Sequence, residues 1–583
     1  MVFLEIESRG KLVDKRRLQW HCRQREFVKK PRVNLPNIHN ALISKPPHKI
    51  CIVPCMDFIT GTSRHQTYFA TLDEQVAADN AVRLIDAFVD KLDLEQLGFT
   101  NTIHKSEGRP PYAPGVLLKL YLYGYLNKIR SSRKLERESV RNIELQWLLK
   151  QLQPNYHTIA DFRKVHVKAL KNMFRLYVQF LGEAGLLGKT TIAIDGSKFK
   201  AVNSKKNNYN QAKIDRHRNF IEEKTNRYLQ ELDELDAQEN KRTEDFSVRK
   251  DKIAQGLQQL RERTIKYDQL QQKLDAATDK QVSTTDPDSR SILVVRSIVE
   301  VAYNVQNAVD DKHHLIVHCE ATNTNDCKAL HHAATQAKQN MELQKADSII
   351  GLADKGYHTG AELKQCHDDN IITHVAYKEQ PSVKHIAPEF LAESFIYHKQ
   401  TDSYLCPAGA TLTSLGTWYN KKGEAGETSF RFKTYRTAAC KSCPLKNQCT
   451  QQPKRIIQRS EYQDAVDIND NNIRQNPQYY KQRQAIVEHP FGTVKRHWGY
   501  TFTLLKGLQK VNGEFNLIMF CYNFMRTKNI LGFDKMLNAL QNWQPNYAKI
   551  VCALKNHFNR LICSQNAALL FYYPAPLSFL QAA

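Results

Sequence analysis

Two short apolar segments that each lead into a single aspartate constrain the fold of this chain most strongly. Residues 190–194, TTIAI, precede Asp195, and residues 349–353, IIGLA, precede Asp354. Runs of this length and composition predict buried strands, each with an aspartate at its carboxyl end. A lone aspartate at a strand end is more often a helix cap or an ion-pair partner. Two of them at one edge of a sheet could hold divalent metal ions.

The pattern around these segments predicts a specific order of elements. Residues 299–319 alternate as a β-hairpin with its turn at residues 310–312, a helix follows Asp326, another begins near Thr359, and residues 371–377 form a strand. This βββαβαβ order predicts an α/β fold with a ribonuclease H-like catalytic core. The first and fourth strands are neighbours in that core. Asp195 and Asp354 would therefore meet although 159 residues separate them.

A third carboxylate is expected from a helix that follows the last strand. Glu488 lies in a short apolar run, and Lys495 follows seven residues later, on nearly the same face of a helix. Proline is unfavourable in the middle of a helix. Because Pro490 follows Glu488 by two residues, Glu488 is expected near the helix start or at a kink. Glu488 would hold a second metal ion, and Lys495 would contact a phosphate. The alternative is a Glu and a Lys on a solvated helix face.

The charge balance favours a polyanionic partner. Lys and Arg number 84 against 60 Asp and Glu, which gives a net charge of +24. Nucleic acid is the first candidate. An anionic membrane is the alternative, but no apolar stretch has the roughly 18 residues that a span needs. With no signal peptide and an odd number of cysteines, 13, the chain is expected to be cytoplasmic and without a disulfide framework.

Basic residues directly after Asp195 could hold DNA phosphates and offset the charge of the acids. For each of them alone, an exposed basic loop is the alternative. They are Lys198, Lys200, Lys205 and Lys206, with Asn203 and Asn207 between and beside them.

Residues 56–185 predict a helical DNA-binding domain. Thr71, with Glu74 three residues on, and Thr158 are expected helix N-caps. Basic residues in this part could contact phosphates, or they form a solvated helix face; they are Arg130, Arg133, Lys134, Arg137 and Arg141. The expected buried positions beside them are Val140, Ile143, Leu145 and Leu148. Residues 1–55 lack such a pattern and are expected to be a non-native extension, with translation starting at Met56.

Two insertions are expected within the core, which would comprise residues 186–205, 290–378 and 480–530. Residues 206–289 predict a helical hairpin, a short antiparallel coiled coil that pairs subunits, lies along DNA or serves as a strut. Its apolar positions are spaced by sevens at Ile214, Ile221, Tyr228 and Leu235, and at Ile253, Leu260, Tyr267 and Leu274. Residues 531–583 are expected to be a C-terminal tail.

The second insertion, residues 379–479, is rich in cysteine. Four thiolates with one C-x2-C pair could close a tetrahedral structural Zn²⁺ site. Buried free thiols, or a residual fold that has lost its metal, are the alternatives. The four are Cys406, Cys440, Cys443 and Cys449.

Several motifs together resemble the DDE transposases of bacterial insertion sequences. These motifs are IDGSKFKA, DPDSR, YNVQNAVD, ADKGYH and VEHPFGTVKR, together with residues 56–166. The resemblance is greatest to the insertion-sequence eleven-eighty-two group, within the insertion-sequence-four-like superfamily, and it covers residues 56–531. It implies a catalytic triad of Asp195, Asp354 and Glu488 that binds two Mg²⁺ or Mn²⁺ ions.

Related elements carry the motif Tyr-x2-Arg-x3-Glu-x6-Lys. Tyr480, Arg483, Glu488 and Lys495 keep this order, but four residues separate Arg483 from Glu488 here. The resemblance implies that Tyr480 and Arg483 contact DNA ends.

The resemblance also implies the reaction and the partners. The expected activity is metal-dependent cleavage at the element ends, followed by transfer of the new 3′ end into target DNA. The terminal inverted repeats and the target would be the DNA partners, bound by a homodimer. The alternatives are a metal-dependent nuclease without strand transfer and an inactive or repurposed DNA-binding descendant.

Overall fold

The computed structural model describes residues 64–100, 110–237, 244–277, 279–295, 298–377, 386–422 and 428–548. The expected extension at residues 1–55 lies outside the described residues, as does the predicted tail after residue 548. The chain divides into two units, Met1–Phe69 and Ala70–Ala583. All elements named below belong to the second unit.

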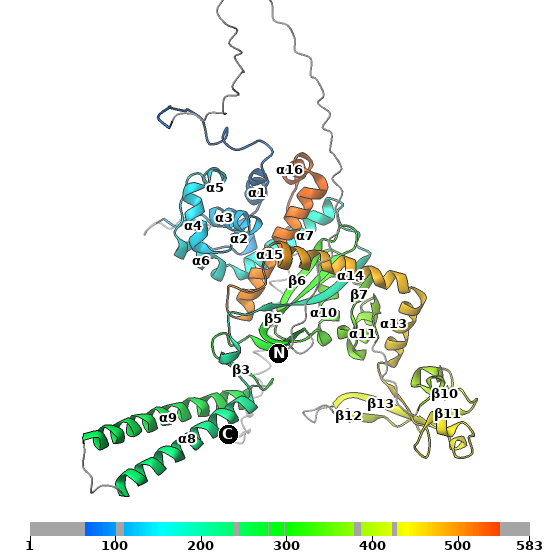
Figure 1. The fold of residues 1–583 in the computed structure, drawn as a ribbon. Helices are drawn as coiled ribbons and strands as arrows, with labels where there is room; N and C mark the ends of the chain where they lie inside the picture. The colour runs from blue at the N-terminus through cyan, green and yellow to red at the C-terminus, as the bar shows by residue number, and fades with distance from the viewer. Residues whose placement is uncertain are drawn as a thin grey trace, which may run out of the picture. The chain divides into compact units, whose positions relative to one another are not determined.

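A six-stranded mixed sheet forms the centre of this unit (Figure 1). Its order is β4-β5-β1-β7-β8, and β6 also pairs with β5. β1 is parallel to β7, which is parallel to β8, and β5 is antiparallel to β1, β4 and β6. The strands are β1 (Thr191–Lys200), β4 (Arg290–Val295), β5 (Ile298–Asp310), β6 (Ile316–Thr322), β7 (Ile349–Ala353) and β8 (Ile371–Val375).

Most of the predicted elements of this sheet are confirmed, and one boundary is wrong. The β5–β6 hairpin, strand β7 and helix α11 (Gly360–Asp368), with Thr359 at its N-cap position, lie where the sequence predicts them. β1, however, does not end at Asp195 but continues to Lys200. The reason is the long partner β5, which pairs with β1 from Ile192 to Lys200. Asp195 therefore lies within a strand, just beyond the residues that pair with β7.

Asparagine side chains bond backbone groups of two edge strands, β6 and β8. On helix α15 (Leu508–Leu531), Asn523 accepts from the Ile316 N–H at 2.9 Å and donates to the Ile316 carbonyl at 2.8 Å. Asn512 bonds both backbone groups of Ala321 on the same strand, β6. On helix α13 (Gln463–Gln475), Asn469 does the same for Val375 of β8, at 2.8 Å for both bonds. These amides replace neighbouring strands as hydrogen-bond partners.

The helices before the sheet share one hydrophobic core with it. They are α1 (Ala81–Asp90), α2 (Leu94–Leu97), α3 (Pro114–Leu126), α4 (Ser132–Arg141), α5 (Ile143–Leu148), α6 (Tyr156–Val165) and α7 (Val167–Glu183). Helix α15 packs on α7 and α3 and also on β6 (Figure 1). Phe88 of α1 and Val305 of β5 belong to the same buried cluster. Residue 185 therefore marks no boundary between separate cores.

The predicted tail begins as part of this core. Helix α16 (Phe533–Asn542) buries Met536 and Leu540. Trp543, which follows it, stacks on Phe88 with ring centroids 6.2 Å apart. The assignment of residues 531–583 as a tail is thus wrong for the part up to Trp543.

Three local predictions in the helical region need correction. Thr71 and Glu74 do exchange hydrogen bonds, but they form a turn, and helix α1 begins at Ala81 with Asn80 as its N-cap. Helix α6 is capped by Asn155, whose side chain accepts from Thr158 N. Val140 is 52% exposed rather than buried. Helix α4 ends at Arg141, and Asn142 caps the next helix, α5.

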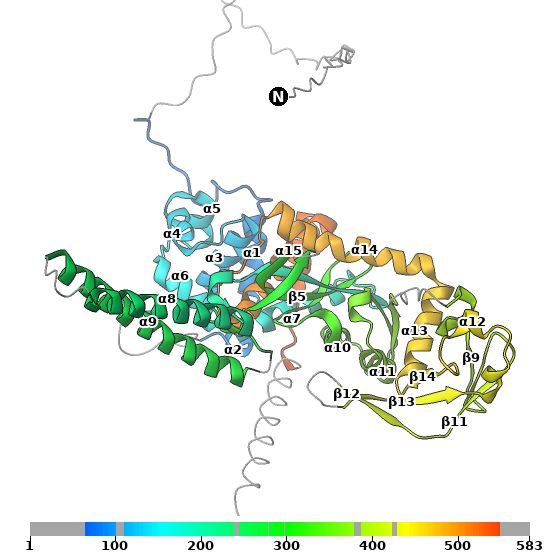
Figure 2. The ribbon, with the colours of Figure 1, turned by 60° about the horizontal axis from the view of Figure 1, so that its bottom comes forward.

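The predicted helical hairpin consists of α8 (Gln211–Ala237) and α9 (Glu244–Ala276), which lie side by side (Figure 2). Of the residues spaced by sevens, Ile214, Ile221, Ile253, Leu260 and Leu274 are buried. Leu270, outside that spacing, is also buried.

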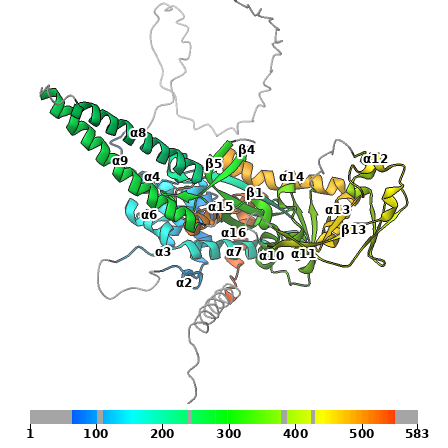
Figure 3. The ribbon, with the colours of Figure 1, turned by 90° about the horizontal axis from the view of Figure 1, so that it is seen from below.

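The cysteine-rich insertion contains a second sheet, in the order β12-β13-β11-β10-β9, with β14 paired to β13. Its strands are β9 (Ile396–His398), β10 (Ser403–Leu405), β11 (Thr411–Ser414), β12 (Tyr419–Lys422), β13 (Thr428–Arg436) and β14 (Ile457–Ser460). Arg459 of β14 forms ion pairs with Asp464 and Asp467 of α13, the helix beside this sheet (Figure 3).

Within the described parts of the chain, no helix combines the length and the apolar character needed to cross a membrane.

Candidate active site

Asp195 lies on β1, and Asp354 directly follows β7, the parallel neighbour of β1. Thr191 pairs with Ile350 and Ala193 with Leu352, and this offset of 159 residues also separates Asp195 from Asp354. Asp354 immediately follows β7 and caps a short 3₁₀ turn (Lys355–Tyr357), accepting from Gly356 N at 2.7 Å. Asp195 accepts from the N–H of Gly196 at 2.8 Å.

A third acid, Asp326, lies beside these two and was not predicted as a site residue. Its Oδ1 accepts from Asn304 Nδ2 and Gln306 Nε2, both at 2.7 Å. Its Oδ2 accepts from Lys198 Nζ at 2.9 Å. A signal was present in the sequence, since Asn304 and Gln306 alternate on one face of a predicted strand. Only the fold brings Asp326 to that face.

Gly196 makes room for this cluster. A Cβ atom at residue 196 would lie within 3.0 Å of Asp326 Oδ1, Gln306 Nε2 and Asn304 Oδ1. Any larger residue would push Asp326 out of place, so side chains of the site itself approach the backbone closely at Gly196.

Burial and neighbouring charges determine the protonation of Asp195. Burial raises its pKa to about 6, the Arg483 guanidinium opposes that rise, and the charges of Asp354 and Asp326 add to it. The three carboxylates are therefore close enough to repel one another. Such a concentration of negative charge is expected of groups that share a cation.

Tyr357 lies beneath the acids. It is fully buried, and its hydroxyl donates to Gln306 Oε1. Burial and the charges of Asp326, Asp195 and Asp354 raise its pKa well above the usual value. Tyr357 therefore stays protonated and holds Gln306, which in turn holds Asp326.

Helix α14 (Pro477–Gly492) brings Tyr480 and Arg483 to the acids. The charge of Arg483 acts on Asp195, and Tyr480, whose pKa is raised by burial, is affected by Asp354 and Asp195. The Arg483 guanidinium lies 5.9 Å from the centre of the Tyr480 ring. Both residues thus lie at the site despite the altered spacing of the motif.

Glu488 is exposed, and its side chain is bonded within its own helix. Its Oε1 accepts from Gln484 Nε2 at 2.7 Å. Within the described residues, the carboxylate oxygens of Asp195, Asp354 and Glu488 do not all lie within 4.8 Å of one another, the separation at which three side chains could share a metal ion. Glu488 also lies in the last turns of α14 rather than near its start. Pro490 sits inside the helix, and the chain continues beyond it as a π-helix (Thr493–His497).

Lys495 and the lysines that follow Asp195 each have their own partners. Lys495 Nζ donates to the Lys198 carbonyl at 2.7 Å and lies 4.4 Å from the centre of the Phe199 ring. Burial and the charge of Lys198 lower the pKa of Lys495 to about 8. Lys200 and Lys205 form ion pairs with Glu300 at 3.7 and 3.9 Å.

The two asparagines between residues 200 and 208 are hydrogen-bonded, and Lys206 is exposed. Asn203 donates to Ser289, and Asn207 donates to Thr285.

Arg133 and Arg137 are exposed on helix α4, as a DNA-binding role requires. Arg130, by contrast, is not exposed, so the prediction that it contacts DNA phosphates is wrong. It is buried and bonds the Phe502 carbonyl at 2.7 Å and Glu514 Oε1 at 2.8 Å. Glu514 is completely buried and needs this cation as a partner.

The four cysteines of the insertion influence one another electrostatically, but within the described residues their sulfur atoms do not form a group that lies within 4.8 Å. Burial raises the pKa of Cys449, and the other three, Cys406, Cys440 and Cys443, are near enough to add to this effect. The Cys406 sulfur accepts from Ala410 N at 3.3 Å. All four are free and half-buried.

Two parts of the chain match known protein families. Residues 70–165, which span α1 to α6, match the family described as Transposase domain (DUF772). Residues 405–527, which include α14 and most of α15, match the family described as Transposase DDE domain. No curated protein matches the chain. The two matches together cover less than half of the chain, and they support a transposase function, which has DNA as its substrate. Transposase domains of the DDE kind generally use divalent metals.

Substitution of Gly196 by Ala tests the packing of the acidic cluster. We expect Gly196→Ala to lower the free energy of unfolding by about 1–3 kcal/mol, because the new methyl group overlaps Asp326 and its partners. Urea denaturation followed by tryptophan fluorescence measures the change. Gly492→Ala is the control, since its Cβ would meet no atom within 4 Å. Equal stability of Gly196→Ala and the unsubstituted protein would contradict the packing described.

Proposed function

We propose that this protein is a DDE transposase that cleaves DNA at the ends of an insertion sequence and transfers the new 3′ end into target DNA. The observation that carries the proposal is that Asp195, on β1, and Asp354, directly after the parallel strand β7, interact electrostatically with each other and with Arg483 and Tyr480 of α14. The two transposase domains support the same conclusion.

We further propose that the sheet is a ribonuclease H-like core. The order β6-β5-β1-β7-β8 supports this assignment, as do the antiparallel first three strands and the parallel last two. It is the order expected from the sequence. β4 and the second sheet are additions to that core.

The acids fit a pair of Mg²⁺ or Mn²⁺ ions, which we propose as cofactors. Asp195 and Asp354 each accept one backbone hydrogen bond and keep lone pairs for a cation. Asp326 accepts three hydrogen bonds and is better suited to position Gly196 and Lys198 than to bind metal. We therefore retain Glu488 as the third ligand, as the resemblance implies.

The bound ions would activate the attacking hydroxyl and stabilise the leaving oxygen. The chain's own residues prepare that reaction. Arg483 offsets the charge of Asp195 before a cation binds, and Gln306 and Tyr357 keep Asp326 in place. Movement of Glu488 toward the site would break only one exposed hydrogen bond, the one from Gln484.

DNA contacts are proposed for basic residues at and around the acids. Lys495 and Lys198, with Tyr480 and Arg483, would hold the phosphates of the cleaved strand. Lys200, Arg133 and Arg137 are exposed and would add contacts along the duplex. Element terminal inverted repeats and target DNA are the proposed substrates, bound by a homodimer.

The proposed setting is the bacterial cytoplasm, at the nucleoid, where the DNA lies. Within the DDE transposases we assign the chain to the insertion-sequence eleven-eighty-two group on the motifs described above. Two alternative functions remain testable. A nuclease would cut without joining, and a repurposed descendant would bind DNA without cutting it.

We also propose that Cys406, Cys440, Cys443 and Cys449 bind one structural Zn²⁺. The mutual effect of the four thiols on the pKa of Cys449 supports this proposal, as does the N–H donated to the Cys406 sulfur. A zinc ion would stabilise the small sheet of the insertion, because the buried hydrophobic cluster of that sheet has five residues in the described part of the chain.

The first test is cleavage and joining of DNA. The full-length protein, a supercoiled plasmid with the native flanking DNA of its gene, and Mg²⁺ or Mn²⁺ should give cuts at the element ends and joined products. Asp354→Asn should reduce both by at least about 100-fold, because a metal ligand is lost. Asp368→Asn, an exposed aspartate on α11, is the matched control and should keep full activity. Cutting without joining would favour the nuclease, and binding without cutting would favour the repurposed descendant.

The second test uses pH. The pKa of Lys495 is lowered to about 8, so Lys495 loses its proton, and its attraction to phosphate, as the pH rises through about 8. The affinity for element-end DNA should exceed that of Lys495→Gln by roughly tenfold at pH 7, and this advantage should shrink by pH 9.5. Fluorescence anisotropy at constant salt measures it. Lys495→Arg stays charged and should keep its affinity at pH 9.5. An advantage that does not vary with pH would argue against a phosphate contact.

The third test is zinc content. Elemental analysis of purified Cys443→Ala should find one zinc ion fewer per chain than in the unsubstituted protein. Cys327→Ala removes a half-buried thiol outside the cluster and should change nothing. Equal zinc in both variants would refute the four-cysteine site.

A further inference from the structure

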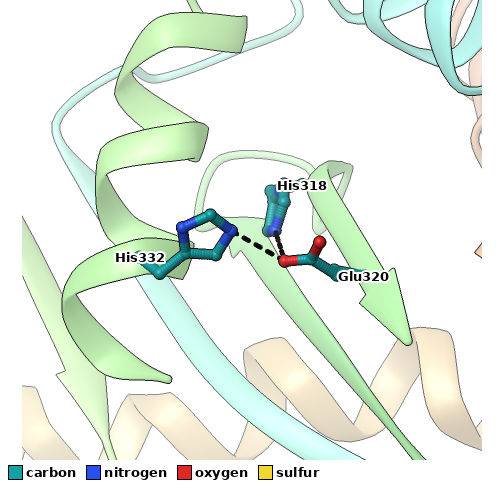
Figure 4. Close-up of side chains that lie close together, drawn as sticks. All are labelled: His318, Glu320 and His332. Carbon is teal, nitrogen blue, oxygen red and sulfur yellow. Dashed lines mark ion pairs between the residues drawn. The ribbon is translucent and has the colours of Figure 1, made fainter. Parts of the chain in front are cut away.

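Two histidines and a glutamate converge outside the acidic site. His318 and Glu320 are two residues apart on β6 and so point to the same face of the sheet. His332 lies in the first turn of helix α10 (Leu330–Asn340). Figure 4 shows the three side chains turned toward one another from the strand and the helix. Their ligand atoms all lie within 4.8 Å of one another.

One carboxylate oxygen faces both imidazoles. Glu320 Oε2 lies 2.7 Å from His332 Nε2 and 3.9 Å from His318 Nε2. His318 is only 2% exposed, and its Nε2 has no hydrogen-bond partner in the part of the chain that the structure describes. A buried ring nitrogen without a partner is costly, and one aimed at a second histidine and a carboxylate is well suited to bind a metal ion.

The other carboxylate oxygen of Glu320, Oε1, forms an ion pair with a lysine outside the cluster. Lys171 Nζ of α7 lies 3.8 Å from Glu320 Oε1. Arg175, one turn further along α7, donates to Gln336 of α10 at 2.9 Å instead. The lysine thus acts on the oxygen that faces away from the histidines. Metal-binding carboxylates are commonly oriented in this way by a second partner.

We propose that His318, Glu320 and His332 bind one divalent transition-metal ion, of which Zn²⁺ is the type. Two imidazole nitrogens and one carboxylate oxygen are a common set of three protein ligands for zinc. His332 is 58% exposed, so the ion would have a path to solvent and a fourth position open to water. The oxygen-rich acidic site, by contrast, suits Mg²⁺ or Mn²⁺.

Such an ion would join α10 to β6. Because α10 follows the 3₁₀ turn that contains Asp326 (Asp326–Lys328), the ion would also restrain the acid that lies beside Asp195. The proposal does not rest on the proposed transposase chemistry, and its test does not require DNA.

The test is metal binding by the full-length protein. Elemental analysis after reconstitution with Zn²⁺ should find one ion fewer per chain in His332→Ala than in the unsubstituted protein. His367→Ala is the matched control, because His367 lies on the adjacent helix α11 and is 57% exposed. Replacement by Co²⁺ distinguishes this site from the four-cysteine site, since nitrogen and oxygen ligands give visible bands without the near-ultraviolet bands of cobalt–thiolate bonds.

His332→Ala should lose the visible bands of the nitrogen and oxygen site and retain the thiolate bands. Glu320→Gln should lose the same bands, and circular dichroism shows whether each variant is folded. Zinc content and cobalt spectra of His332→Ala identical to those of the unsubstituted protein would overturn the proposal. An equal loss of zinc in His367→Ala would also overturn it, because the metal would then be bound by surface histidines in general.

Discussion

The arrangement of the acids depends on how the open edges of the central sheet are satisfied. A sheet of this kind ends in two edge strands whose backbone groups need partners. Here Asn523 and Asn512 of α15 bond the backbone of β6, and Asn469 of α13 bonds that of β8. Each amide serves both the N–H and the C=O of one residue. These bonds fix the edge strands β6 and β8. Between them, β1 pairs with β7, and the two strands lead to Asp195 and Asp354.

Helix α15 also explains why the helical region is not a separate body. It is buried on nearly all sides, and its Glu514 is held by Arg130 and by the N–H groups of Leu504 and Leu505. The start of the helix is bonded by Asp286 and Asp288 of the DPDSR motif, through Gly507 N and Leu508 N. That motif therefore acts on the fold rather than on a substrate. The exposed arginines of α4 and the acids of β1 and β7 lie on one continuous core.

The acidic site combines burial with a fixed set of polar neighbours. Burial alone would favour neutral aspartates, and Arg483 opposes this at Asp195. Asp326 is fixed by Gln306, which Tyr357 holds from below, and Gly196 leaves the space that this arrangement needs. The positions of Asp195 and Asp326 are therefore fixed by their protein neighbours, whereas the exposed Glu488 is not part of this arrangement.

The sequence by itself determined the strands, because apolar runs of strand length have few other stable environments; β7 and the β5–β6 hairpin lie where the pattern predicts them. The order of elements, matched to that of a ribonuclease H-like core, also predicted that the strands leading to Asp195 and Asp354 are neighbours, and β1 does pair with β7. Only the tertiary structure decided where β1 ends, that Arg130 is buried, and that Asp326 and the His318 cluster lie where they do. These features depend on contacts between residues far apart in the chain, such as β5 extending β1 and Glu514 drawing in Arg130, which no local pattern encodes.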